Sequence, residues 1–264
     1  MKQITLLNSE TWEVLDLENK MKNDDFYYDY LGKNALSSSS IKHLLKSPKK
    51  YKYITQYAQP MTSSMMIGWL THCAILEPEK FEKLIFIDVQ SRRTKKFKEA
   101  NDQNKNVFTI KEREEVERLQ DAVYRNEQAL KLLTKCEYEV PKIGSINGLA
   151  FRGKADVLCG KKIVDIKTTS DIELWDKKKQ YVTGSPYKLH YDVQAFIYSS
   201  IFDIDYKNFV FLVIDKASLD IGIFECSEEF YNSGREKTYE AISRYQQFFV
   251  DGADIDSYTL RGTL

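Results

Sequence analysis

One stretch decides how this chain is interpreted: Asp156-Val-Leu-Cys-Gly-Lys-Lys-Ile-Val-Asp165-Ile-Lys167. Its pattern predicts two short strands that meet at a two-residue turn, Gly160-Lys161. In that register Asp156 lies opposite Asp165, and opposed residues of an antiparallel pair share a face, with Cβ atoms about 5 Å apart. Asp165 and Lys167 are two residues apart on one strand, so they share that face as well. The stretch therefore gathers two carboxylates and an ammonium group on one side of a hairpin.

Two carboxylates at this separation repel each other unless a positive charge lies between them. A divalent cation meets that requirement, with the Lys167 ammonium beside it. The ordinary explanation of charged strand residues is a solvated outer sheet face, and an Asp-x-Lys triplet alone is a weak pattern. Aspartate is uncommon in β-strands, however, and here it occurs at two opposed positions. The hairpin therefore predicts a divalent-metal site.

The strand before the turn predicts one charged and one apolar face, because the two kinds of residue alternate. The charged side holds Arg152, Lys154 and Asp156. The side that meets the core holds Phe151, Ala155 and Val157. The register also places Lys154 opposite Lys167, a like-charge pair that lowers stability unless anions lie nearby. Carboxylates and a phosphodiester would supply those anions.

The composition limits the class of protein. Its 264 residues, 42% apolar and 13% aromatic, are enough for a substantial core. A formal net charge of zero argues against a purely electrostatic nucleic-acid coat protein. It leaves room for a nuclease whose acidic metal site and basic groove cancel. No apolar run is long enough to span a bilayer, and the N-terminus lacks the features of a signal peptide.

Four cysteines are scattered along the chain without a C-x-x-C pair: Cys73, Cys136, Cys159 and Cys226. This spacing predicts neither a zinc knuckle nor a disulfide framework. Together with the absence of a leader or membrane segment, it predicts a reduced, cytoplasmic protein.

Strand-like segments cluster in the second half of the chain, at 136–143, 148–159, 162–169, 208–215 and 220–227. Helices are expected over 187–203, between the third and fourth strands, and over 228–250. Earlier helices should begin at Ser37–Ser40, cover 64–76, and run from the capping box Thr109-x-x-Glu112 to about 135. That last helix carries apolar residues at helical spacing: Val116, Leu119, Val123 and Leu130.

These segments predict a single α/β domain with a central mixed β-sheet flanked by helices. An ordered but irregular segment, 1–35, precedes a mainly helical portion, 36–135. The core, 136–250, holds the sheet, and 251–264 form a C-terminal tail. Residues 91–106 are polar without periodicity and predict a mobile loop.

Two helical pairs carry groups of possible chemical interest. Gln194 and Tyr198 are four apart and share a helix face, with His190 one turn earlier. On their own, such residues usually pack or meet solvent. Gly68 and His72 are also four apart, and a histidine among apolar neighbours is most often a core residue. Imidazole nevertheless binds divalent cations, and Gly68 would let another backbone approach.

Four motifs in this order resemble a known family. They are Gly68-x-x-x-His72, Gly153-x-x-Asp156, Asp165-Ile-Lys167-Thr-Thr and Gln194-x-x-x-Tyr198. They are similar to the motifs of RecB-like members of the PD-(D/E)XK nuclease superfamily, and most similar to the RecE-like (exonuclease VIII) branch of phage and prophage exonucleases. The flanking sequence Leu36-Ser-Ser-Ser-Ser-Ile-Lys-His-Leu-Leu-Lys-Ser-Pro agrees. The resemblance covers roughly residues 36–250 and implies a restriction-endonuclease-like core.

The resemblance implies a Mg²⁺ site, in which Mn²⁺ could substitute. The implied protein ligands are His72, Asp156, Asp165 and the backbone carbonyl of Ile166. Oxygen-rich sites suit Mg²⁺, which also accepts substrate phosphate oxygens, and one ion or two are both compatible. Lys167 would orient or deprotonate the attacking water, and Gln194 and Tyr198 would position the strand or the lysine. Glu139 is a weaker candidate for an outer or second-metal contact.

The implied substrate is the end of a linear DNA duplex, digested 5′ to 3′ to leave 3′ single-stranded tails for recombination. Relatives form rings around DNA and act for a single-strand annealing protein. A ring-forming homo-oligomer and a RecT-like partner are therefore expected, in a bacterial host cell. Phosphate contacts without sequence readout are expected from basic residues: Arg92, Arg93, Lys95, Lys96 and Lys98 in the polar loop, and Arg152 and Lys154 on the strand. For the loop cluster, a solvated charged segment is an equal alternative.

This sequence differs from some other relatives of the superfamily, and the differences bear on the alternative functions. AddB-type and Cas4-type nucleases bind an iron–sulfur cluster, with one cysteine just before the proline of the N-terminal motif. This chain has Ser47-Pro48 there and no C-terminal cysteine trio, so no cluster is expected. The alternatives are a Cas4-like or restriction-type nuclease of different polarity, a non-catalytic DNA-binding protein that keeps the fold, and an unrelated α/β protein with a charged sheet face.

Overall fold

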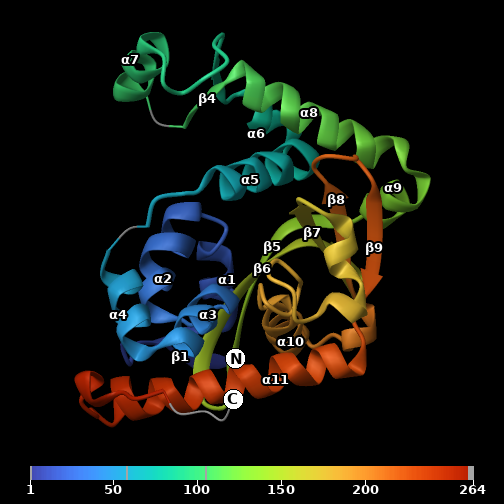
Figure 1. The fold of residues 1–264 in the computed structure, drawn as a ribbon. Helices are drawn as coiled ribbons and strands as arrows, with labels where there is room; N and C mark the ends of the chain where they lie inside the picture. Colours follow the sequence, from blue (N-terminus) through green and yellow to red (C-terminus); the bar gives the residue numbers. More distant parts are fainter. Residues whose placement is uncertain (1, 58, 105, 261–264) are drawn as a thin grey trace.

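A mixed five-stranded sheet forms the centre of the computed structural model, which describes residues 2–57, 59–104 and 106–260 (Figure 1). In spatial order its strands are β5 (Glu137–Ile146), β6 (Leu149–Cys159), β7 (Lys162–Thr169), β8 (Phe209–Asp215) and β9 (Ile221–Glu225). β7 and β8 are parallel, and the other neighbours are antiparallel. The predicted α/β class with a central mixed sheet is confirmed.

Helices cover both faces of this sheet. The parallel strands β7 and β8 need a crossover between them, and its helix covers one face. The crossover contains α10 (Tyr191–Phe202), which packs with α3 (Ser38–Lys46) and α11 (Glu228–Tyr245) in one core. α5 (Ser63–Leu76) and α8 (Ile110–Arg125) pack on the other face in a second core. Figure 1 shows α5 and α8 on one side of the sheet and α11 on the opposite side.

The predicted division into one apolar and one charged sheet face is wrong. On β7, Ile163 packs into the core of α10, whereas Val164 packs into the core of α5. The residues expected together on the apolar face are divided between these cores: Phe151 and Ala155 in the first, Val157 in the second. The carboxylate-bearing Asp165 is fully buried. Because both faces are covered, the charged groups of the hairpin lie in the interior and need partners there.

The predicted hairpin turn at Gly160-Lys161 is confirmed, since Cys159 pairs with Lys162 and the ladder continues to Val157 and Val164. Gly160 has a φ of +58°, which glycine adopts without strain. Beyond this point the side chain of Asp156 accepts a hydrogen bond from the Ile166 amide, at 2.7 Å, where a strand partner would otherwise bond.

The predicted like-charge pair of Lys154 and Lys167 does not form. The Lys154 ammonium lies 2.7 Å from Asp24, and that of Lys167 pairs with Asp165. The hydrogen-bonded pairing of β6 and β7 ends at Val157 and Val164, before these positions, and each lysine pairs with a different carboxylate.

α10 begins later than predicted because His190 has a left-handed backbone, with a φ of +58°. His190 therefore precedes the helix and does not share the face of Gln194 and Tyr198. α11 and a following π-helical turn, Gln246–Val250, together match the predicted segment 228–250. Helices α10 and α11 approach each other closely at Gly234, where a Cβ would overlap the carbonyl oxygen of Asp192.

The N-terminal half is largely helical and adds small strand pairs. Its elements before α3 are β1 (Gln3–Thr5), β2 (Thr11–Glu13), α1 (Val14–Lys20), a π-helical turn (Phe26–Tyr30) and α2 (Leu31–Asn34). Those after it are α4 (Pro48–Gln56), α6 (Pro78–Glu82), β3 (Ile85–Ile87), α7 (Lys95–Gln103), β4 (Val107–Thr109) and α9 (Glu127–Leu133). Within the described residues, no helix is long and apolar enough to cross a membrane.

Three local predictions in this half are wrong. The segment 1–35 is regular, with a hairpin and helices around its own core of Leu17, Met21 and Leu31. The expected loop 91–106 contains α7, whose Phe97 is buried beneath the Arg92 guanidinium; residue 105 of that segment lies outside the described residues. The long helix to about 135 breaks at Asn126, which caps α9, so Leu130 is exposed. In the predicted tail, 261–264 also lie outside the described residues.

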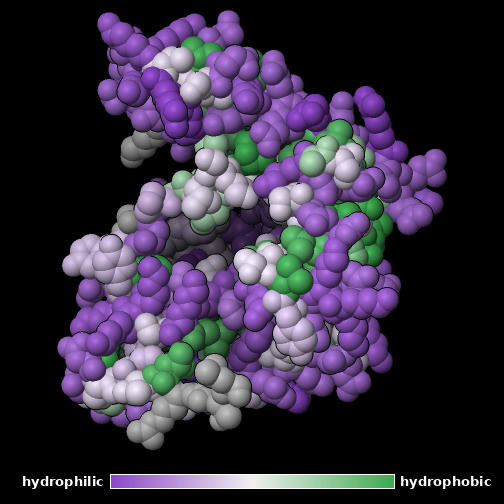
Figure 2. All heavy atoms as spheres, viewed as in Figure 1, coloured by the Kyte–Doolittle hydropathy of each residue, from purple (hydrophilic) through white to green (hydrophobic). Residues whose placement is uncertain are grey.

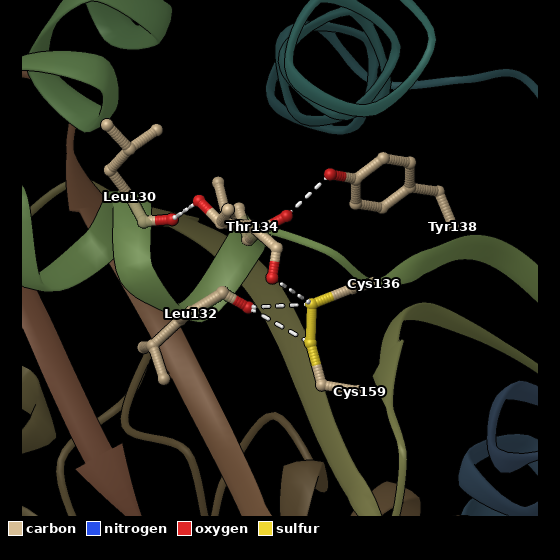
Figure 3. The surroundings of a disulfide bond; sticks show 7 residues. Leu130, Leu132, Thr134, Cys136, Tyr138 and Cys159 are labelled. Carbon is tan, nitrogen blue, oxygen red and sulfur yellow. Dashed lines mark hydrogen bonds between the residues drawn. A yellow bond between two sulfur atoms is a disulfide. The ribbon is translucent and has the colours of Figure 1, made fainter.

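A disulfide joins Cys136 and Cys159, contrary to the prediction of a reduced chain (Figure 3). The β5–β6 register pairs Glu137 with Leu158, so the two cysteines that flank this pair face each other, with Cα atoms 4.6 Å apart. Their separation of 23 residues hides this contact from the sequence. Cys73 and Cys226 are free and buried.

We predict that Gly234→Ala destabilises the protein by about 1–3 kcal/mol, because the added methyl group forces α10 and α11 apart. Alanine is the better helix former by about 1 kcal/mol, so a loss of stability would isolate the packing effect. Urea denaturation measures it, with the exposed neighbour Arg235→Ala as control. A Gly234→Ala protein as stable as the wild type would contradict the close approach.

Candidate active site

The charged hairpin lines a cleft of about 510 Å³ between the N-terminal elements, α5 and the β5–β6 pair. Figure 2 shows a hollow near the middle of this face of the molecule, below α5. The lining of the cleft includes polar groups from separate parts of the chain: Asp24, Ser38, His72, Glu139, Arg152 and Asp156. A second hollow, lined by Lys167, Thr168 and Lys216, shares Gly68 and His72 with the first. The two hollows therefore meet at α5.

Three ligand-type side chains converge at the floor of the cleft. His72 of α5, Glu139 of β5 and Asp156 of β6 each place a donor atom within 4.8 Å of the other two. The closest pair is His72 Nδ1 and an Asp156 carboxylate oxygen, 3.4 Å apart. Glu139 has a φ of +52° and interrupts the β5–β6 ladder, a conformation that is uncommon for a residue with a side chain. The arrangement is a candidate metal-binding group.

Mutual interaction shifts the pKa of each member of this group. Burial opposes the ionisation of Asp156, but His72, Lys167 and the Ile166 amide outweigh it and lower the pKa of Asp156. Burial alone would lower the pKa of His72, and the neighbouring Asp156 raises it overall. Burial, with Asp156 adding to it, raises the pKa of Glu139 to about 7. A divalent cation would relieve the repulsion between the two carboxylates.

Asp165 lies beside this group and has its own partners. Gln194 of α10 donates a hydrogen bond from Nε2 to Asp165 Oδ1, at 2.5 Å, and the Lys167 ammonium pairs with Oδ2. Burial, with a contribution from Asp156, raises the pKa of Asp165 to about 6. Burial lowers and Asp165 raises the pKa of Lys167, and the net shift is upward. The hydrogen bond from Gln194 therefore connects the Asp165–Lys167 ion pair to α10.

Tyr198 reaches the site because β6 has a glycine beneath it. A Cβ at Gly153 would lie 2.8 Å from the Tyr198 ring, so any larger residue would displace the tyrosine. The Tyr198 hydroxyl accepts a hydrogen bond from the Lys154 amide at 3.3 Å, and burial raises its pKa well above the usual value. Gly68 has a different role from the one predicted, since the nearest atom to a Cβ there is the Thr168 hydroxyl, at 3.6 Å, and not a backbone.

The structure brings most of the predicted site residues together. His72, Asp156, Asp165, Lys167, Gln194 and Tyr198 form one continuous cluster. The side chain of Ile166 packs in the core and its carbonyl oxygen lies 3.5 Å from Lys167 Nζ. The metal ligands and catalytic roles stay a prediction, and the group that converges includes Glu139 where the predicted ligand set has Asp165.

The predicted DNA-binding residues divide into two groups. Arg152 and Lys154 line the cleft. Of the described chain, Arg92, Arg93, Lys95, Lys96 and Lys98 are not among the residues that line it. Arg92 pairs with Glu112 at 2.7 Å and stacks on Phe97, which gives it a structural role. Arg93, Lys95, Lys96 and Lys98 lie on α7 or just before it, and of these Lys95 pairs with Glu99.

Two features of the site are absent from the sequence predictions. Lys42 of α3 lies 5.1 Å from the centre of the Tyr191 ring, which Lys167 approaches to 5.0 Å. Burial, with Lys167 adding to it, lowers the pKa of Lys42 to about 8. Asp24, Tyr27 and Tyr28 form a wall of the cleft. The aromatic run Phe26-Tyr-Tyr-Asp-Tyr is the only sequence signal for that wall.

Residues 37–252 match a family described as a PDDEXK-like domain of unknown function (DUF3799). The chain belongs to this family. The predicted resemblance to the PD-(D/E)XK superfamily is thereby confirmed, and the restriction-endonuclease-like core coincides with the sheet that carries the site. No curated protein matches the sequence.

One solved structure agrees with this fold. A protein from Eubacterium rectale, provisionally named as an exonuclease, is similar with a TM-score of 0.66 and 14% identity, over 92% of this chain and 95% of that one. At this identity the likeness shows a shared fold. A phage-related exonuclease from Haemophilus somnus 129PT matches with a TM-score of 0.35 and 17% identity, over 82% of this chain and 96% of that one. That TM-score is too low to support an argument.

We predict that Lys42→Met stabilises the PDDEXK-like domain below pH 8. The lysine's pKa falls from 10.5 to about 8 on folding, so the native state binds fewer protons than the unfolded state between these values. The charged lysine therefore destabilises the fold below pH 8 by at most about 3 kcal/mol, and this effect fades toward pH 10.5. Denaturation from pH 6 to 10.5, with the exposed Lys46→Met as control, measures it. Equal stabilities of Lys42→Met and the wild type at all pH values would contradict the burial of this charge.

Proposed function

We propose that this PDDEXK-like protein is a Mg²⁺-dependent DNA exonuclease that hydrolyses the phosphodiester bonds of linear duplexes. One observation carries the proposal: buried Asp165 and Gln194, with half-buried Lys167, adjoin the convergent group of His72, Glu139 and Asp156, in a cleft open to solvent. A buried sheet gains no stability from this many charges, because each must be stripped of water. Such a cluster is typical of a site that acts on a charged substrate.

The donor set fits a hard divalent cation. Two carboxylates and one imidazole lie close enough to share an ion, and oxygen-rich sites suit Mg²⁺ or Mn²⁺. A bound ion would polarise a phosphate oxygen and lower the pKa of a water molecule. His72, Glu139 and Asp156 would hold it, with Asp165 as a further ligand on the side of β7.

The remaining residues would act on the phosphodiester and its water. The Lys167 ammonium would stabilise negative charge that develops on the phosphate. Gln194 holds the Asp165 carboxylate in place by its hydrogen bond, and so fixes the lysine that pairs with it. Tyr198, packed against Gly153 and bonded to the Lys154 amide, would keep α10 in register with β6.

The finer parts of the proposal rest on the resemblance to RecE-like exonucleases. They are digestion from 5′ to 3′, the production of 3′ tails for recombination, a ring-shaped homo-oligomer, a RecT-like annealing partner and action in the cytoplasm of a bacterial host of a phage or prophage. A Cas4-like or restriction-type nuclease of different polarity, and a non-catalytic DNA-binding protein, are the alternatives that activity assays separate.

We predict that linear duplex DNA is degraded in Mg²⁺ or Mn²⁺ and not in EDTA. Asp165→Ala should lower the rate by about 100-fold or more, because it removes the partner of both Lys167 and Gln194. The exposed Asp251→Ala serves as the matched control and should keep full activity. Degradation that survives both EDTA and Asp165→Ala would rule out the metal-site mechanism.

We predict that a blocked 5′ end prevents digestion and that a blocked 3′ end does not. Covalently closed circles should resist, because an exonuclease needs an end. Gel analysis of end-labelled duplexes measures both. Protection by the 3′ block alone would contradict the predicted polarity and indicate digestion from 3′ to 5′. Cleavage of closed circles would favour an endonuclease.

A further inference from the structure

Arg152 is a buried arginine without a carboxylate partner. It is 9% exposed, and its Nε atom is buried with no hydrogen-bond partner in the part of the chain that the structure describes. Four other arginines of the described chain have anionic partners: Arg92 with Glu112, Arg113 with Glu82 and Glu117, Arg125 with Asp121, and Arg244 with Glu240. Three more, Arg93, Arg118 and Arg235, are exposed to solvent. Arginine stays charged in proteins, so an unpaired buried guanidinium lowers stability unless a ligand compensates for it.

The fold directs this guanidinium into the cleft. Arg152 lines the same cleft as Asp156, and its guanidinium carbon lies 4.4 Å from the centre of the Tyr27 ring, which also lines the cleft. Lys154, two residues along the strand, lines the cleft as well. Lys154 is paired with Asp24 at 2.7 Å, and the other carboxylates of the lining are Glu77, Glu139 and Asp156.

The first turn of α3 lies next to Arg152. The Leu36 amide donates to Ala150 O and the Arg152 amide donates to Leu36 O, both at 2.8 Å, so the chain enters α3 alongside β6. The Ser37 hydroxyl caps the helix by accepting from the Ser40 amide. Among the recorded hydrogen bonds of the described residues, none uses the amides of Ser38 and Ser39, and both residues line the cleft. Free amides at a helix N-terminus bind anions.

We propose that Arg152 and the first turn of α3 form a phosphate-binding subsite beside the catalytic group. A guanidinium binds two phosphate oxygens at once, and helix amides and serine hydroxyls supply further donors. The inference rests on the proposed function, because DNA is the polyanion that would bring phosphate to this cleft. The phosphate would be either a 5′-terminal monoester or an internal diester, and both present the same oxygens to Arg152.

Thermal unfolding with inorganic phosphate, in EDTA and without DNA, tests the subsite apart from catalysis. Phosphate should raise the melting temperature of the wild type and of the exposed control Arg235→Gln, and raise it less for Arg152→Gln. Without phosphate, Arg152→Gln should be at least as stable as the wild type, because it removes an uncompensated charge. A lower melting temperature of Arg152→Gln with an undiminished phosphate response would make Arg152 a structural residue and overturn the proposal.

A second variant isolates the helix. Ser38→Pro removes one amide at the first helical position, where proline is tolerated, and Ser37 already has the extended backbone that precedes proline. It should lower the phosphate response and preserve the far-ultraviolet helix signal. An unchanged response of this variant would remove α3 from the proposed subsite.

DNA binding in EDTA identifies the source of the phosphate. If the ligand is a 5′-terminal monoester, the wild type should bind 5′-phosphorylated duplexes about tenfold more tightly than 5′-hydroxyl duplexes, and Arg152→Gln should lose this preference. If it is an internal diester, Arg152→Gln should weaken both by about tenfold. Wild-type affinity of Arg152→Gln for both duplexes would overturn the subsite. If phosphate raises the melting temperature as expected but the protein has no nuclease activity, the subsite is supported and the proposed function is contradicted.

Discussion

The Asp156 carboxylate ties together the elements that form the site. One of its oxygens accepts from the Ile166 amide of β7 at 2.7 Å and lies 3.4 Å from His72 of α5. The bond to Ile166 occurs just beyond the last recorded β6–β7 pair, so a side chain takes the place of a strand partner. Asp165 then faces the core side of α10, where Gln194 and Lys167 compensate its buried charge. The sheet, α5 and α10 are thereby fixed relative to one another by charged groups.

Much of the fold could be predicted from periodicity. The five strands and the Gly160-Lys161 turn follow from alternation and from glycine, which are local properties. Predictions failed where a tertiary contact decides the outcome. α7 forms where polar sequence suggests a loop, because Phe97 is anchored under Arg92. Cys136 and Cys159 meet only through the β5–β6 register.

The site could likewise be predicted where it depends on local spacing, but not where it depends on contacts between distant segments. The motifs identify side chains that do gather at one place, because helix and strand spacing determine which residues share a face. They name Glu139 only as a weaker candidate for a metal contact, since its place in the convergent group depends on its own left-handed backbone, which interrupts a ladder. Nor do they show that Lys42 approaches Lys167, or that Arg152 has no anionic partner among the described residues. Those relations arise between distant segments.

The central claim is that His72, Glu139 and Asp156 bind a divalent cation at a phosphodiesterase site. Anomalous diffraction from crystals soaked in Mn²⁺ tests it most directly, because it locates the ion without relying on activity. We predict a peak at coordination distance, about 2.0–2.3 Å, from donor atoms of at least two of these three residues. No peak at the group in Mn²⁺-soaked crystals, or a peak held by other residues instead, would contradict the account.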